Sequence, residues 1–99
     1  MKRRLAKIRW LKPQEGGRSQ LPRVESLRSV SRFDVDPNYK LGTWDLIIKF
    51  KKLPTARSLS IQAEIAFASE DAPAQLLRVG SRFELAEGKK TVARGVVIE

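Results

Sequence analysis

Residues 82–99 read RFELAEGKKTVARGVVIE and contain the clearest strand-turn-strand pattern of the chain. Phe83 and Leu85 alternate with polar or small residues, as on a strand with one buried face. Glu87 and Gly88 then provide a turn signal, and a stretch rich in β-branched residues follows. The chain is therefore predicted to end in a β-hairpin.

The same period-two alternation recurs in four segments upstream. It is strongest over residues 59–67, where every second side chain is apolar, and weaker at about 5–11, 29–35 and 44–50. Turn signals separate the segments. We expect the apolar faces to form one core that includes Ile8, Trp10, Trp44, Leu46, Ile48, Phe50, Leu59, Ile61, Ile65, Phe67 and Phe83.

Three other segments carry no strand pattern. Residues 19–27, which contain Pro22, are expected to form a long loop. Leu76 and Leu77, within 69–80, are expected to form a cap or a single helical turn. Tyr39 is the aromatic residue expected outside the core, whereas the others pack inside it or, as the alternative, stack on bases.

Six strands without a long helical pattern or an internal repeat predict an all-β fold. The 99 residues suffice for a single domain, 1–99, which buries roughly 60 to 70% of the surface of its unfolded chain. The strand pattern alone leaves both a barrel and a sandwich open. A closed barrel would remove the exposed strand edges.

The chain has no cysteine and no histidine. Disulfides, thiolate metal sites and cysteine nucleophiles are thereby excluded, and the commonest general base is missing. Glu64, Glu84 and Glu87 could supply a carboxylate pair, but acidic residues on strands and turns are usually solvated charges. We expect a protein that is not an enzyme and uses no metal or other cofactor.

No apolar run reaches the roughly 18 residues of a membrane span. The basic start is followed by Lys7, Arg9 and Lys12 instead of the roughly 7 to 15 apolar residues of a signal peptide. We therefore expect no membrane insertion and a cytoplasmic location.

The net charge of +9 is concentrated in the first third of the chain. Residues 1–33 hold ten basic and two acidic residues, whereas residues 34–66 hold five and four, and residues 67–99 hold five and five. Such an asymmetric field attracts polyanions: nucleic acid, an acidic protein or an anionic membrane surface. The alternative is that the charge only keeps a small domain soluble.

Two segments, EGGR at residues 15–18 and the closing hairpin, resemble the C-terminal β-barrel domain of elongation factor Tu and related translational GTPases. In that family a strand leads into a Glu-Gly-Gly-Arg turn, and the domain closes on a hairpin of the form Arg-Phe, Glu-Gly, Thr-Val, Gly-Val-Val. The order of strands extends the likeness over nearly the whole chain. The resemblance implies a closed six-stranded antiparallel β-barrel of the translation-factor C-terminal domain type.

In that family both turns approach the T-stem of aminoacyl-tRNA. On local grounds EGGR could be only a glycine turn, but the resemblance makes Arg18 and Ser19 candidate phosphate contacts. Two lysines replace the family's second glycine and arginine in the hairpin turn, so the charge is kept but the bidentate geometry is lost. The candidate RNA-binding residues are Arg3, Arg4, Lys7, Arg9, Arg18, Ser19, Glu87, Gly88, Lys89 and Lys90.

The family's GTPase domain has no counterpart, because no Gly-x-x-x-x-Gly-Lys-Ser/Thr phosphate loop occurs, and we expect no GTP binding. The sequence favours a noncatalytic module that binds structured, tRNA-like RNA or another polyanion through its basic N-terminal face. The alternative is a protein-protein interaction module with no nucleic-acid binding. Attachment to an anionic membrane surface is a third possibility, but the sequence shows no amphipathic helix to support it.

Overall fold

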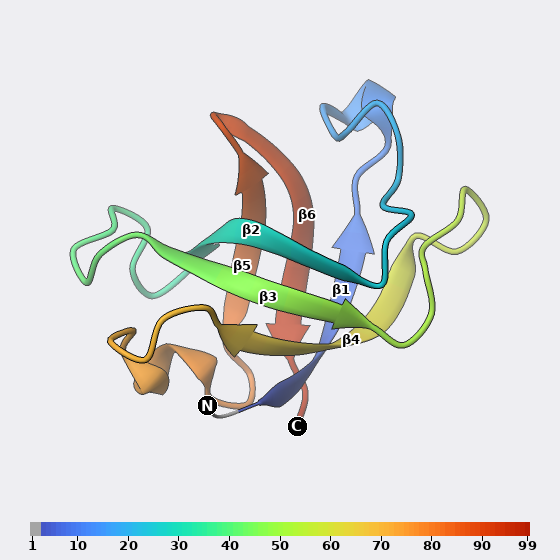
Figure 1. Ribbon diagram of the computed structural model, residues 1–99. Helices are drawn as coiled ribbons and strands as arrows, with labels where there is room; N and C mark the ends of the chain where they lie inside the picture. Colours follow the sequence, from blue (N-terminus) through green and yellow to red (C-terminus); the bar gives the residue numbers. More distant parts are fainter. Residues whose placement is uncertain (1–2) are drawn as a thin grey trace.

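Each segment of alternating apolar and polar residues forms a strand in the computed structural model, which describes residues 3–99. Within these residues six strands close into an antiparallel barrel in the order β1-β4-β3-β2-β5-β6, and β6 returns to β1 (Figure 1). The strands are β1 (Arg4–Trp10), β2 (Ser26–Phe33), β3 (Trp44–Phe50), β4 (Ser60–Phe67), β5 (Arg82–Glu87) and β6 (Lys90–Val97). The expected all-β barrel is confirmed.

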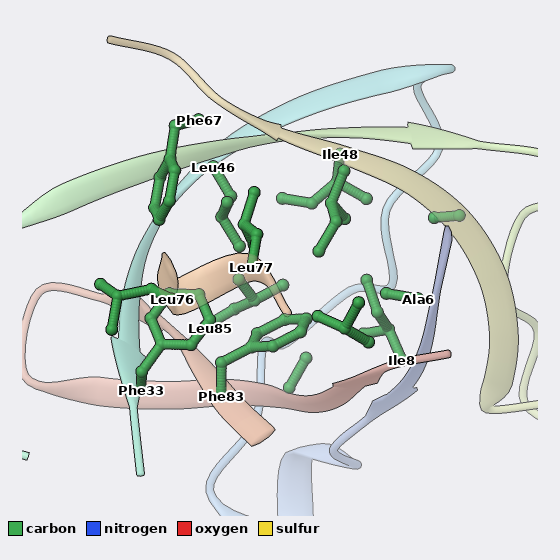
Figure 2. Close-up of a cluster of buried hydrophobic side chains, with 14 of the residues drawn as sticks. Ala6, Ile8, Phe33, Leu46, Ile48, Phe67, Leu76, Leu77, Phe83 and Leu85 are labelled. Carbon is green, nitrogen blue, oxygen red and sulfur yellow. The ribbon is translucent and has the colours of Figure 1, made fainter. Parts of the chain in front are cut away.

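Two short 3-10 turns, η1 (Pro13–Glu15) and η2 (Ala74–Leu77), are the only helical segments in residues 3–99. η2 places Leu76 and Leu77 in the buried hydrophobic cluster that Figure 2 shows. The expectation of a single helical turn at Leu76-Leu77 is therefore confirmed. The turn therefore contributes two buried leucines to the core.

The boundaries of β2 differ from the predicted strand 29–35. β2 begins earlier because Ser26 pairs with Lys49 of β3, so the end of the expected loop 19–27 joins the ladder. It ends at Phe33 because the Asp36 carboxylate accepts hydrogen bonds from two backbone N–H groups of the following loop, at 2.9 Å each. Val35, which has the same parity as Phe33 within the predicted strand 29–35, lies beyond the end of β2 and is 77% exposed.

Most of the predicted core is buried. The exceptions are Trp44, Phe50 and Leu59, which are half-buried and lie at the ends of β3 and just before β4, where the barrel opens. Parity alone does not show where along a strand the barrel ends. Phe33 and Leu85 are buried, as aromatic character and strand parity respectively predicted, and the core also contains Ala6, Leu11, Ala63, Leu76, Leu77, Val92, Ala93 and Val97.

Gly95 of β6 is required by the aromatic core. It pairs with Phe83 of β5, and a Cβ atom added at Gly95 would lie 2.4 Å from Cζ of the Phe83 ring. That ring continues a row of aromatic contacts, with Phe33 at 5.5 Å between ring centroids and Phe67 at 5.9 Å from Phe33. The glycine near the end of the closing hairpin therefore makes room for Phe83.

Replacing Gly95 by alanine should destabilise the barrel. The added methyl group displaces a ring that is itself fully packed, and overpacking of this kind costs about 1 to 3 kcal/mol. Urea denaturation of the purified protein measures this change. The double variant Gly95→Ala/Phe83→Leu should lose less free energy of unfolding than the sum of the losses in the two single variants. The smaller leucine side chain makes room for the added methyl group. Additive losses would show that the two residues do not share this space.

Candidate nucleic-acid interface

The EGGR turn is built by local hydrogen bonds after β1 ends. The Glu15 carboxylate accepts a hydrogen bond of 2.9 Å from the backbone N–H of Lys12 and so fixes η1. Gly16 adopts a left-handed conformation, with φ of +89°, which a residue with a side chain rarely takes. A Cβ on Gly17 would lie 2.2 Å from the carbonyl oxygen of Leu11. The local backbone geometry therefore explains why both positions are glycine.

Arg18 connects the two turns on which the family resemblance rests. Its Nε lies 3.3 Å from the carboxylate of Glu87, the last residue of β5 before the β5–β6 turn. The Arg18 side chain is only 29% exposed, and its Nη1 is enclosed with no hydrogen-bond partner among residues 3–99. Arg18 thus fastens the loop to the hairpin and presents less of its guanidinium to a ligand than the sequence suggests.

The remaining candidates at this end of the barrel are accessible. Ser19 is exposed directly after Arg18, Gly88 and Lys89 are exposed in the hairpin turn, and Lys90 is exposed at the start of β6. Gly88 has a φ of +62°, which suits the tight connection. The structure therefore brings the candidates of both turns to one end of the barrel through the Arg18–Glu87 ion pair.

Arg3 and Arg4 lie at the opposite end of β1 from the EGGR turn. Arg3 is exposed and approaches the carboxylate of Glu64 at 4.0 Å. Arg4 has the inward parity of Ala6, is half-buried, and has an enclosed Nε without a hydrogen-bond partner in the described part of the chain. Neither joins the surface made by the two turns. Lys2, which contributes to the basic third, lies outside the described residues.

Lys7 and Arg9 occupy exposed positions on β1. Closure of the barrel brings two further cations, Arg82 and Arg94, close to them. Arg94 of β6 lies directly opposite Arg9, and Val96, two residues later, lies between Lys7 of β1 and Arg82 of β5. These residues surround a shallow depression of about 210 Å³. We call it the basic depression; its lining is Lys7, Arg9, Ser60, Arg82, Arg94, Gly95 and Val96.

The charges around the basic depression are only partly compensated. Arg9 and Arg94 are like charges in directly opposed positions, an arrangement that destabilises a strand pair. Arg9 is paired with Glu15 at 3.4 Å, and Arg94 Nε lies 3.7 Å from the Glu84 carboxylate. Within residues 3–99, Lys7 and Arg82 have no ion-pair partner.

Glu84 holds one rim of the basic depression in place. Its carboxylate, 18% exposed, accepts hydrogen bonds from Arg32 and from the Thr91 hydroxyl, the latter at 3.2 Å. The hydrogen bond from Arg32 lowers the pKa of Glu84, with further lowering by Arg32's charge, Thr91 and Arg94, against the opposing effect of burial. Glu84 therefore stays ionised in neutral solution and positions Arg94.

Sequence reasoning missed Arg82 and Arg94 as candidates. Their alternation with the inward residues Phe83 and Gly95 already indicates an outward orientation. Their nearness to Lys7 and Arg9 was not visible, because it depends on the pairing of β6 with β1 across the closing seam of the barrel.

No model of a known protein family matches this chain, and a search of curated proteins gives no match either. In the part of the chain that the structure describes, no three side chains of the His, Cys, Asp and Glu types gather as a metal site. No helix within residues 3–99 is both long and apolar enough to cross a membrane.

Replacing Glu84 by glutamine should change how stability depends on pH. A carboxylate with a lowered pKa in the folded state stabilises that state above its unfolded-state pKa, and this contribution is lost as pH falls through the folded-state pKa. The free energy of unfolding of the variant should be about 1 kcal/mol lower than that of the wild type at neutral pH. On acidification it should decrease less than the free energy of unfolding of the wild type. Melting temperatures between about pH 7 and pH 3 test this around the ordinary glutamate pKa.

Glu70→Gln is the matched control for this measurement, because Glu70 is an exposed loop residue and none of the ion pairs within residues 3–99 involves it. Its melting curve should follow that of the wild type at each pH. Parallel curves for the wild type and Glu84→Gln would mean that Glu84 is not the group whose protonation weakens the fold.

Proposed function

We propose that this protein is a noncatalytic binding module for structured, tRNA-like RNA, and that the basic depression is the main contact surface. The observation that carries the proposal is the convergence of Lys7, Arg9, Arg82 and Arg94 from three neighbouring strands. Two of these cations face each other directly, and two have no ion-pair partner within residues 3–99. A phosphate placed among them would relieve repulsion that the protein itself leaves in place.

The likeness to the C-terminal domain of elongation factor Tu supports the choice of RNA. The closed barrel fits that domain, and the two family-like turns lie together at one end through Arg18 and Glu87. Lys89 and Lys90 stand beside this pair as exposed positive charges. In this proposal the turn end contributes charge and shape, whereas the basic depression contributes most of the phosphate contacts. A-form RNA offers phosphates and 2′-hydroxyls more readily than base edges.

A specific observation also favours the alternative, a protein-protein interaction module. The loop between β2 and β3 exposes Val35 and Leu41, at 77% and 47%. Asp36 holds this loop in shape through its hydrogen bonds to the N–H groups of Lys40 and Leu41. Exposed apolar side chains on a loop whose backbone is hydrogen-bonded suit an apolar partner. Such binding would respond weakly to salt, whereas phosphate binding responds strongly.

The double variant Lys7→Glu/Arg82→Glu tests the RNA proposal. Both side chains are exposed, so the melting temperature should stay close to that of the wild type. Fluorescence anisotropy with a labelled tRNA transcript should show at least about tenfold weaker binding and a shallower salt dependence. If two to four phosphates are neutralised, wild-type affinity should fall about 10- to 100-fold between roughly 50 and 200 mM salt.

Lys40→Glu/Lys51→Glu is the matched control, with the same change in net charge. Both lysines are exposed in the loops at either end of β3, which is three strands from β6 in either direction around the barrel. This variant should weaken binding much less. Equal losses of RNA affinity in the two double variants would show that net charge alone causes the effect. An absence of tRNA binding by the wild type at low salt would favour the protein-interaction alternative.

A further inference from the structure

We propose that the basic depression binds two successive phosphates of one nucleic-acid strand, which lies along β1 and β6. This inference rests on the proposed function and specifies the unit of ligand that the surface takes. It follows from the register of the strands, which arranges the four cations in two rows.

The first row consists of Arg94 on β6 and Arg9 on β1, which are directly opposite each other, and it ends on β5 at Glu84, which lies opposite Arg94 and pairs with it. The second row consists of Arg82 on β5, Val96 on β6 and Lys7 on β1. The rows are two residues apart, which is roughly 6.6 to 6.8 Å along a strand. This separation is close to that of neighbouring phosphates in a nucleic-acid strand, so each row can serve one phosphate.

The space between the rows suits a sugar. Ile8 and Gly95, the paired residues between the rows, face the core, so only backbone separates the rows on the outside. In the second row the half-buried Val96 offers an apolar contact between its flanking cations. Ser60, opposite Arg9 on β4, adds an exposed hydroxyl at the edge of the first row. The cations and the surface between them therefore match a phosphate-sugar-phosphate unit.

The two rows differ in how firmly their cations are held. Arg9 and Arg94 each have a carboxylate partner, Glu15 and Glu84 respectively, and keep further N–H donors for a ligand. Within the described residues, the second-row cations Lys7 and Arg82 have no carboxylate partner. The first row is thus a preorganised phosphate site, and the second row adapts to the next phosphate along the strand.

Titration with short RNA of increasing length tests this arrangement. Uridine 5′-monophosphate, the 5′-phosphorylated uridine dinucleotide and the corresponding trinucleotide carry one, two and three phosphates. NMR chemical shifts of backbone amides at low salt report affinity and location. The dinucleotide should bind about fivefold more tightly than the monophosphate, since exposed ion pairs each contribute modestly. The third phosphate should add less than about twofold, because no third row exists within the lining of the depression.

The double variant Lys7→Gln/Arg82→Gln should abolish the gain from the second phosphate and leave monophosphate affinity within about twofold. Lys40→Gln/Lys51→Gln removes the same charge elsewhere and should preserve the gain. An equal gain for each added phosphate, or a gain that survives Lys7→Gln/Arg82→Gln, would overturn the two-row arrangement. If the tRNA transcript binds while the dinucleotide shows no gain, only this inference fails; if no RNA binds, the proposed function fails as well.

Discussion

The contact between the Phe83 ring and Gly95 is the constraint on which the barrel depends. Because Gly95 has no side chain, the ring lies over the β6 backbone and joins the aromatic row with Phe33 and Phe67. The same glycine pairs on its other side with Ile8 of β1, across the seam that closes the barrel. A single residue therefore serves both the aromatic core and the closure. Closure of the barrel also leaves no unpaired strand edge among the six described strands.

Closure has an electrostatic consequence on the outer face. The β1–β6 seam joins the basic N-terminal segment to the C-terminal hairpin and sets Arg9 directly against Arg94. A repulsive pair at a seam would be easy to avoid by exchanging one arginine for a neutral residue. Local arrangements that oppose stability are typically found where a protein serves a ligand, and this reasoning supports the proposed role of the basic depression. Glu15 and Glu84 keep the two arginines ordered without neutralising the whole surface.

The glycine turn after β1 and the hairpin between β5 and β6 have a clear structural role. Gly17 allows close approach to Leu11, and Arg18 then reaches Glu87. This ion pair joins the loop after β1 to the last hairpin and explains why a charged residue follows the glycines. Arg18 and Arg4 are both half-buried, so reversing either charge would disturb the fold as well as any ligand. The exposed cations of the basic depression are better suited to contact phosphate in the proposed role.

The sequence by itself determined the six strands and the inward parity of residues such as Ile61 and Phe83, because period-two alternation follows directly from strand geometry. It also located the glycine turns and the basic third. Only the tertiary structure decided where the barrel ends, leaving Phe50 half-buried, and which cations become neighbours. Arg9 and Arg94 are 85 positions apart, and their proximity depends on the register of β1 with β6. Alternation fixes which face a side chain occupies, whereas register and closure fix what lies opposite it.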